Sequence, residues 1–200
     1  MLKWISTYTN LNDEQLMTLV ASGKTAGLKE LYNRYNQKLL YYLYRMMGGN
    51  EEKAQDLLQE VFLKVIDKSY QFDSSHKFST WIYTIASNLC KNEYRSKKVR
   101  EVVENDVDMD RHEWDEKNQE QLLEENMFEK AIQNELSQMD VERKTTFILR
   151  FQENYSISEI AIIQDCSPGT IKSRLHYITR SLAAKLKEFD PNEIEVSNDA

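Results

Sequence analysis

Hydrophobic residues recur every three or four positions through most of the first hundred residues, and this spacing predicts amphipathic helices. Capping residues or glycines stand at several of the predicted helix ends. The first predicted helix begins at Asn12 and Asp13 and ends at Gly23, and the second carries apolar residues from Leu28 to Leu43 and ends at Gly48 and Gly49. The third extends from Glu51 to about Lys68, and the fourth from Ser79 to about Arg100. A loop, residues 69–77, joins the last two helices.

The helical pattern stops after residue 100 and returns near Leu122. Residues 101–120 are acidic and almost free of aliphatic periodicity, which indicates a linker. Helical spacing resumes over 122–136 and again over 141–151.

Residues 156–187 carry the start signals of two short consecutive helices. Ser156 and Glu159 form a capping box, in which each side chain satisfies a backbone amide of the other residue. Ser167 followed by Pro168 is a second start signal, an N-cap serine with proline in the first helical position. A short helix, a tight turn and a capped second helix are typical of a helix-turn-helix, although a plain helical hairpin has the same elements.

Composition supports a fold class of all-α, in which two small helical domains are joined by an acidic linker and the C-terminal domain is a helix-turn-helix. Five glycines and two prolines are too few for a turn-rich β architecture. No apolar run has membrane-spanning length and the amino terminus lacks the order of a signal peptide, so we expect a cytoplasmic protein. Cys90 and Cys166 are expected to be reduced, partly buried thiols.

The net charge of −7 disfavours nucleic-acid binding, but the charge is distributed unevenly along the chain. Residues 1–100 hold 15 Lys and Arg against 10 Asp and Glu, a net charge of +5, and residues 136–187 hold 8 against 5, a net charge of +3. Residues 101–135 hold 3 against 13, and residues 188–200 hold 5 acids and no base. Two basic blocks are therefore separated and followed by acidic segments.

The helix predicted over 51–68 has an apolar face and an acidic one. The apolar arc contains Ala54, Leu57, Leu58, Val61, Phe62 and Val65. The opposite arc contains Asp56, Gln59, Glu60, Leu63 and Asp67. A single exposed leucine is common by chance, and it is also what a docking surface offers, so the pattern alone leaves both interpretations open.

The helix predicted over 79–100 has a polar face beside its apolar one, with Thr84, Asn88, Lys91 and Arg95 at helical spacing. This face is either a solvated surface or a track along a phosphate backbone, with Asn88 able to pair with a base edge. The preceding loop is rich in rings, namely Tyr70, Phe72, His76 and Phe78. Unpaired bases stack on aromatic rings for roughly 1–3 kcal/mol each, although some of these rings are expected to pack under the loop.

An enzyme is disfavoured because the chain has no glycine-rich phosphate loop. His76, His112 and His176 lie on separate segments, and neither cysteine has a metal-ligand spacing. We therefore predict no catalytic residue, no metal, no cofactor and no small-molecule substrate. Another alternative is a one-component transcriptional regulator with a helix-turn-helix and a helical sensor domain, but it gives no reason for the Leu63 face or the aromatic loop.

Four segments resemble bacterial sigma factors of the sigma-70 family, extracytoplasmic-function (ECF) subfamily. AQDLLQEVFLKV resembles the core-binding helix, FSTWIYTIASNLCKNEYR the promoter-reading helix, and EIAIIQDCSPGTIKSRL the region-4 helix-turn-helix. NDEQLMTLVASGKTAGLKELYNRY is similar to the start of region 2. The resemblance covers about three quarters of the chain, in the family's order and spacing. It implies a region-2 domain over 1–100, the linker over 101–121, a region-4 domain over 122–189 and an acidic tail over 190–200.

The resemblance also assigns roles to the surfaces. It implies that core RNA polymerase is bound by Asp56, Gln59, Glu60 and Leu63. It implies that the −10 element, with its melted non-template strand, is bound by Tyr70, Phe72, His76, Lys77, Thr84, Asn88, Lys91 and Arg95. It implies that the double-stranded −35 element is bound by Ser167, Thr170, Lys172, Ser173, Arg174, His176, Tyr177 and Arg180. Members of the family are commonly held inactive by an anti-sigma factor, which is a further expected partner.

Overall fold

The computed structural model describes residues 8–103 and 123–186, and all regular elements in these two segments are helical. We call residues 8–103 the N-terminal unit and residues 123–186 the C-terminal unit. The N-terminal unit contains α1 (Asp13–Ala21), α2 (Thr25–Met46), α3 (Glu51–Asp67), the 3-10 turn η1 (Ser69–Gln71) and α4 (Phe78–Val103). The C-terminal unit contains α5 (Leu123–Gln138), α6 (Val141–Phe147), the π-helical η2 (Ile148–Gln152), α7 (Ile157–Gln164) and α8 (Pro168–Lys185). The predicted all-α fold is confirmed.

Helix starts follow the capping residues that the sequence indicates. The Asn12 side-chain oxygen accepts a hydrogen bond from the backbone N–H of Gln15, and the Gln15 side-chain oxygen accepts one from the backbone N–H of Asn12, so α1 opens with a capping box. Ser156 and Glu159 form the predicted box at α7, and Ser167 caps α8 with Pro168 in the first turn. These local interactions fix where each helix begins and therefore which of its faces points inward.

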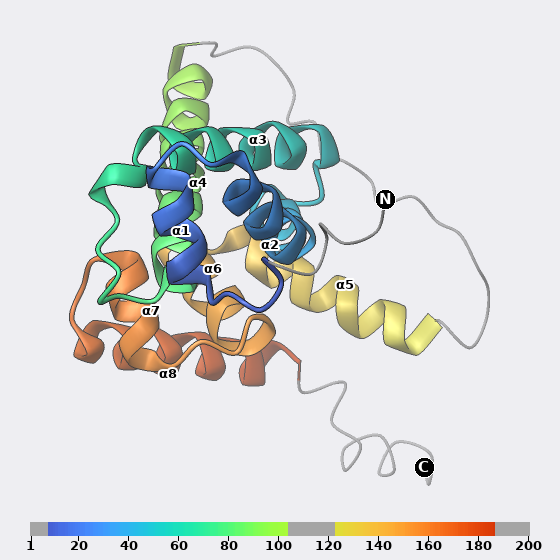
Figure 1. Cartoon of the computed structure of the whole chain (residues 1–200). Coiled ribbons are helices and arrows are strands. Elements are labelled where there is room, and N and C mark those ends of the chain that lie inside the picture. Colours follow the sequence, from blue (N-terminus) through green and yellow to red (C-terminus); the bar gives the residue numbers. More distant parts are fainter. Residues whose placement is uncertain (1–7, 104–122, 187–200) are drawn as a thin grey trace, which may run out of the picture.

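The inner face of α3 matches its predicted arc. Its buried residues are Ala54, Leu57, Leu58, Val61, Phe62 and Val65. They pack in the N-terminal unit, where α3 contacts α2 and α4. Figure 1 shows α4 extending from α3 at one end of the molecule to α7 at the other.

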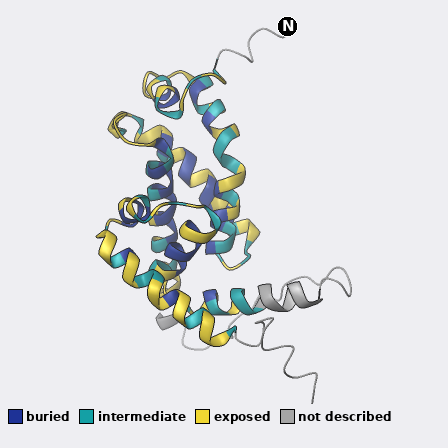
Figure 2. Ribbon diagram, turned by 90° about the horizontal axis from the view of Figure 1, so that it is seen from below, coloured by how far each residue is buried: buried dark blue, intermediate teal, exposed yellow. Residues whose placement is uncertain are grey.

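Buried residues form one cluster that runs through both units, from Leu16 in α1 to Ile178 in α8 (Figure 2). The two units touch because α4 packs against α6 and α7, and α2 packs against α6. The polar ends of several side chains, among them Tyr83 and Lys144, meet partners across this contact.

The predicted linker, residues 101–121, lies outside the described residues except for its start, since α4 continues to Val103. The predicted tail, residues 190–200, lies outside them entirely. Cys90 is buried and Cys166 half-buried, and both are free thiols as predicted. In the described residues, no helix is both long and apolar enough to cross a membrane.

Candidate functional site

The outer face of α3 presents the residues expected to bind polymerase. Asp56, Gln59 and Glu60 are exposed, and the Leu63 side chain is 64% exposed. Ile66, three residues further on, is 47% exposed and extends the apolar part of this face. Ile66 was not predicted to belong to this face, although its helical spacing from Leu63 is visible in the sequence. An apolar pair within an acidic and amide surface has the composition of a protein-binding patch.

The aromatic side chains of the loop between α3 and α4 differ in their exposure. Tyr70 is 76% exposed and its hydroxyl accepts a hydrogen bond from the Gln71 amide. Phe72 lies underneath, with its ring 5.3 Å from that of Trp81 and 5.9 Å from that of Phe78. Tyr70 is therefore available for stacking on a base, whereas Phe72 supports the loop from below.

His76 and Lys77, at the end of this loop, each lie beside a carboxylate. Asp73 accepts a hydrogen bond from the backbone N–H of Ser75 and lies 3.3 Å from the His76 ring, and these interactions lower the pKa of Asp73. Lys77 donates to Glu159 of α7 at 2.8 Å, and this hydrogen bond raises the pKa of the lysine. Lys77 is thus bound to the C-terminal unit.

The predicted polar face of α4 lies between its two buried sides. Asn88 and Arg95 are exposed, and Thr84 and Lys91 are half-buried. The Thr84 hydroxyl donates to the carbonyl of Thr80 one turn earlier, which leaves its oxygen able to accept. The four side chains form a continuous row of donors and acceptors along α4.

The turn of the helix-turn-helix begins at Asp165, which ends α7 with its backbone in the left-handed region at φ 52°. The outer face of α8 exposes Lys172, Ser173, His176, Tyr177 and Arg180. Ser167 and Thr170 lie at the start of the helix, where the Ser167 hydroxyl oxygen accepts the backbone N–H of Thr170. The outer face is therefore a basic and polar surface at the molecular exterior.

Arg174 differs from its neighbours on α8 because it is half-buried and faces α7. Its guanidinium donates to the Gln164 side-chain oxygen at 2.6 Å, and Gln164 in turn donates to the Thr146 hydroxyl at 2.8 Å. This chain of hydrogen bonds fixes the angle between α7 and α8 and links both to α6. Arg174 therefore positions the α8 face.

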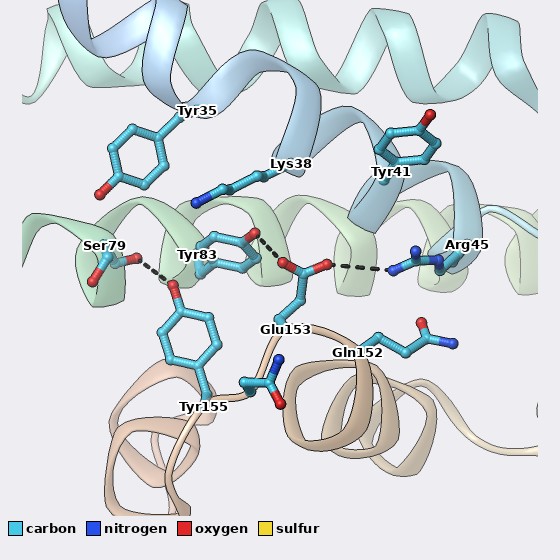
Figure 3. A pocket seen from close by; sticks show the side chains of 10 residues that line it. Tyr35, Lys38, Tyr41, Arg45, Ser79, Tyr83, Gln152, Glu153 and Tyr155 are labelled. Atoms are coloured by element: carbon cyan, nitrogen blue, oxygen red, sulfur yellow. Dashed lines mark hydrogen bonds and ion pairs between the residues drawn. The ribbon is translucent and has the colours of Figure 1, made fainter.

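A polar pocket of about 420 Å³ lies where α2, α4 and the segment before α7 meet (Figure 3). Glu153 is at its centre, accepting from the Tyr83 hydroxyl at 2.8 Å and pairing with Arg45 at 3.4 Å. Burial is the main cause that raises the pKa of Tyr83, so its hydroxyl stays a donor. The Tyr155 hydroxyl donates to the Ser79 carbonyl beside it. The sequence reading gave no role to this pocket, because its members come from segments far apart in the chain.

Comparison with known proteins identifies both halves of the chain. Residues 31–100 match the family model of sigma-70 region 2, and residues 129–177 match that of sigma-70 region 4. The chain is 27% identical over 176 residues to the ECF RNA polymerase sigma factor SigW of Bacillus subtilis, covering 84% of this chain and 94% of that protein. It is 28% identical over 185 residues to the ECF RNA polymerase sigma-E factor of Haemophilus influenzae, covering 88% and 96%.

Solved structures agree with these matches in fold. CnrH in complex with the cytosolic domain of CnrY superimposes with a TM-score of 0.64 at 18% identity, over 89% of this chain and 99% of that one. The sigma factor RpoE of Bartonella quintana, in complex with the anti-sigma factor NepR, gives 0.64 at 22% identity, over 80% and 96%.

Proposed function

The chain belongs to the ECF branch of the sigma-70 family, and from this premise we propose how it directs promoter-specific transcription initiation by RNA polymerase. Sigma factors are not enzymes, so the activity is binding that is stronger to melted promoter DNA than to the closed duplex. The regulator alternative does not account for the region-2 match over residues 31–100.

Core polymerase binds the outer face of α3 in this proposal, through Asp56, Gln59, Glu60 and Leu63. The observation that carries the proposal is the exposure of Leu63, at 64%, in the middle of an acidic surface. Ile66 adds apolar area next to it. Acidic residues around an apolar centre favour a partner with basic side chains around an apolar pocket.

The −10 element is bound by the loop and the polar row of α4. Tyr70 supplies the exposed ring for an extruded base, and Asn88, Lys91 and Arg95 contact the base edge and phosphates. His76 and Lys77 lie at the loop end, and Thr84 begins the row. Phe72 contributes by supporting the loop that carries Tyr70.

The −35 element is bound by α8 in the major groove. Lys172, Ser173, His176, Tyr177 and Arg180 form the reading face, and Ser167 and Thr170 stand at the helix start, where phosphate oxygens approach backbone amides. Arg174 acts through Gln164 by holding α8 at its angle.

An anti-sigma factor is a further proposed partner. The support is that the sigma factor RpoE, which has a similar fold, was solved with the anti-sigma factor NepR. The location of the chain in the cytoplasm is proposed with it, since RNA polymerase acts there.

Titration of the factor against core polymerase tests the α3 face. Leu63→Ala with Glu60→Ala removes the exposed leucine and one acid from the face, and we expect binding to weaken about tenfold or more, as for the centre of an interface. Gln37→Ala, on an exposed residue of α2 rather than α3, is the control and should bind as the wild type does. Wild-type affinity of the double variant, with an intact helical spectrum, would exclude this face as the docking site.

A further inference from the structure

Helix α4, which carries the proposed −10 row, begins at a residue whose side chain cannot cap it. Lys77 stands at the cap position, because its carbonyl accepts the first hydrogen bond of the helix, from the Trp81 N–H at 3.2 Å. A lysine side chain has donors only, so it cannot accept from the free N–H groups of the first turn. Other helices have an N-cap side chain that does accept, namely Asn12 for α1, Asn50 for α3, Asp140 for α6, Ser156 for α7 and Ser167 for α8.

The acceptor at the start of α4 comes from α1, 64 residues earlier in the chain. A Glu14 side-chain oxygen accepts from the backbone N–H of Phe78, the first residue of α4, at 2.9 Å. Phe78 is 0% exposed, so water has little access to this N–H and its loss of Glu14 would leave it unsatisfied. The carboxylate also lies at the end of α4 where the helix dipole favours a negative charge. Figure 1 shows α1 beside α4 and the loop that precedes it.

Glu14 reaches α4 from a fixed position, because its neighbour Asp13 fastens α1 to α2. The Asp13 carboxylate pairs with the Arg34 guanidinium at 2.8 Å and accepts from the Tyr35 hydroxyl. The Tyr35 ring in turn packs edge-on against that of Phe78, with centroids 5.2 Å apart. The start of α1 is therefore connected to Phe78 twice, through the Tyr35 ring and through the Glu14 hydrogen bond.

Phe78 holds the loop between α3 and α4 on both of its sides. The Phe72 ring, which supports the part of the loop that carries Tyr70, lies 5.9 Å from the Phe78 ring. His76 and Lys77 directly precede Phe78 in the chain. A shift of the Phe78 backbone would therefore displace both groups of proposed −10 contacts, and binding sites lose affinity when their supporting residues let them move.

We propose that Glu14 is a positioning residue for promoter opening, which holds the start of α4 and the loop before it in the form that accepts an extruded −10 base. The inference rests on the proposed function, because that function assigns the base to the loop and to α4. Glu14 contacts no DNA in this role and acts through Phe78. Its loss should weaken capture of the single strand while polymerase binding by α3 and duplex binding by α8 stay unchanged.

Binding of a single-stranded −10 segment to the complex of the factor with core polymerase tests this role. The probe is a fluorescent non-template strand from a promoter selected by run-off transcription with the same complex. Glu14→Ala removes the acceptor, and we expect the affinity for the strand to fall about tenfold. Glu14→Gln keeps an acceptor oxygen without the charge, so its affinity should fall only about threefold.

Gln15→Ala is the matched control on the same helix. It breaks the capping box with Asn12, which is local to α1, and leaves the hydrogen bond from Phe78 to Glu14 in place. Its affinity for the single strand should equal that of the wild type. All three variants should bind core polymerase and a −35 duplex as the wild type does.

Amide hydrogen exchange of the free factor, followed by NMR, separates positioning from a general loss of stability. Exchange at the Phe78 amide should be about tenfold faster in Glu14→Ala, whereas amides in the middle of α4, such as Ile85, should exchange as in the wild type. Glu14→Gln should restore most of the protection at Phe78. If Glu14→Ala does not fold, Glu14→Gln decides the question by the same two measurements, with smaller changes in the same directions.

Two results would overturn the inference. One is wild-type affinity of the folded Glu14 variants for the single strand. The other is exchange that accelerates equally along the whole of α4, since this would make Glu14 a stabilising residue without a specific effect on the loop. Tyr70→Ala separates this failure from that of the proposed function. If Tyr70→Ala weakens strand binding and Glu14→Ala does not, the inference alone is wrong, whereas wild-type binding by both variants would also remove the loop from the proposed −10 site.

Discussion

The two helices proposed to read DNA, α4 and α8, are buried to very different extents. Helix α8 buries only Ile171 and Ile178 and turns its whole outer face to solvent. Helix α4 is buried on the side of the N-terminal core, through residues such as Ile82 and Leu89, and again on the side that carries Tyr83, Ser87 and Cys90. The difference shows that the outer face of α8 is open to solvent, whereas one side of α4 is covered by the C-terminal unit.

Matched tyrosine truncations on the two helices should separate these roles most strongly. Tyr83→Ala removes a ring that is 2% exposed and packs against Tyr42 and Tyr155, so we expect the free energy of unfolding to fall by about 3–5 kcal/mol. Tyr177→Ala on α8 removes a ring that is 57% exposed and should change it by less than about 0.5 kcal/mol. Denaturation in urea measures both. Equal effects of the two truncations would mean that the Tyr83 ring is not buried in solution.

The sequence predicts most of the fold because the controlling interactions are local. Capping boxes at α1 and α7, the Ser167-Pro168 start of α8 and the apolar arc of α3 all depend on residues within a few positions of one another. The outer faces of α3 and α8 follow from the same periodicity, since each helix is buried on one side only.

The second side of α4 could not be predicted in this way. The spacing of Tyr83, Ser87, Cys90 and Tyr94 is visible in the chain, but polar and small residues at such positions fit a solvated face equally well. The hydrogen-bond partners of Tyr94 and Tyr83 are Lys144 and Glu153, which lie 50 and 70 residues away in the chain. The inward turn of Arg174 depends in the same way on Gln164, across the helix-turn-helix.

Removing positive charges from α8 and from α4 should weaken binding to different forms of DNA. Lys172→Ala with Arg180→Ala should weaken binding to a duplex carrying the −35 element and reduce the salt slope of log K by about 2, one for each lost phosphate contact. Lys91→Ala with Arg95→Ala, a matched loss of two charges on α4, should leave that duplex slope unchanged and weaken binding to the single-stranded non-template −10 segment in the polymerase complex. Salt titrations by fluorescence anisotropy measure both. An unchanged salt slope for duplex binding by the α8 variant would mean that Lys172 and Arg180 make no phosphate contacts.

The smallest expected effect comes from the titration of Lys144, which is buried, whereas Lys172 and Arg180 on the outer face of α8 are exposed. Burial is the main cause that lowers its pKa to about 8 from 10.5. Below pH 8 the amine is charged in both the folded and the unfolded chain, so the cost of burying the charge is fully present. Above pH 8 the amine of the folded chain becomes neutral while that of the unfolded chain stays charged, so folding releases a proton and the free energy of unfolding rises by up to about 1.4 kcal/mol per pH unit.

The neighbours of Lys144 limit this gain to a narrow pH window. These are the titratable groups Cys90, Tyr94 and Lys97 on α4. Burial raises the pKa of Cys90 to about 12 from 9.0, so above pH 9 the thiol of the unfolded chain loses its proton, which favours unfolding and opposes the effect of the lysine. The free energy of unfolding, measured by denaturation in urea at each pH, should therefore rise between pH 8 and 9 and then level off. Lys144→Met removes the titrating amine at similar length, and its free energy of unfolding should be flat over that range. A rise of the same size in the variant would assign the pH dependence to another group.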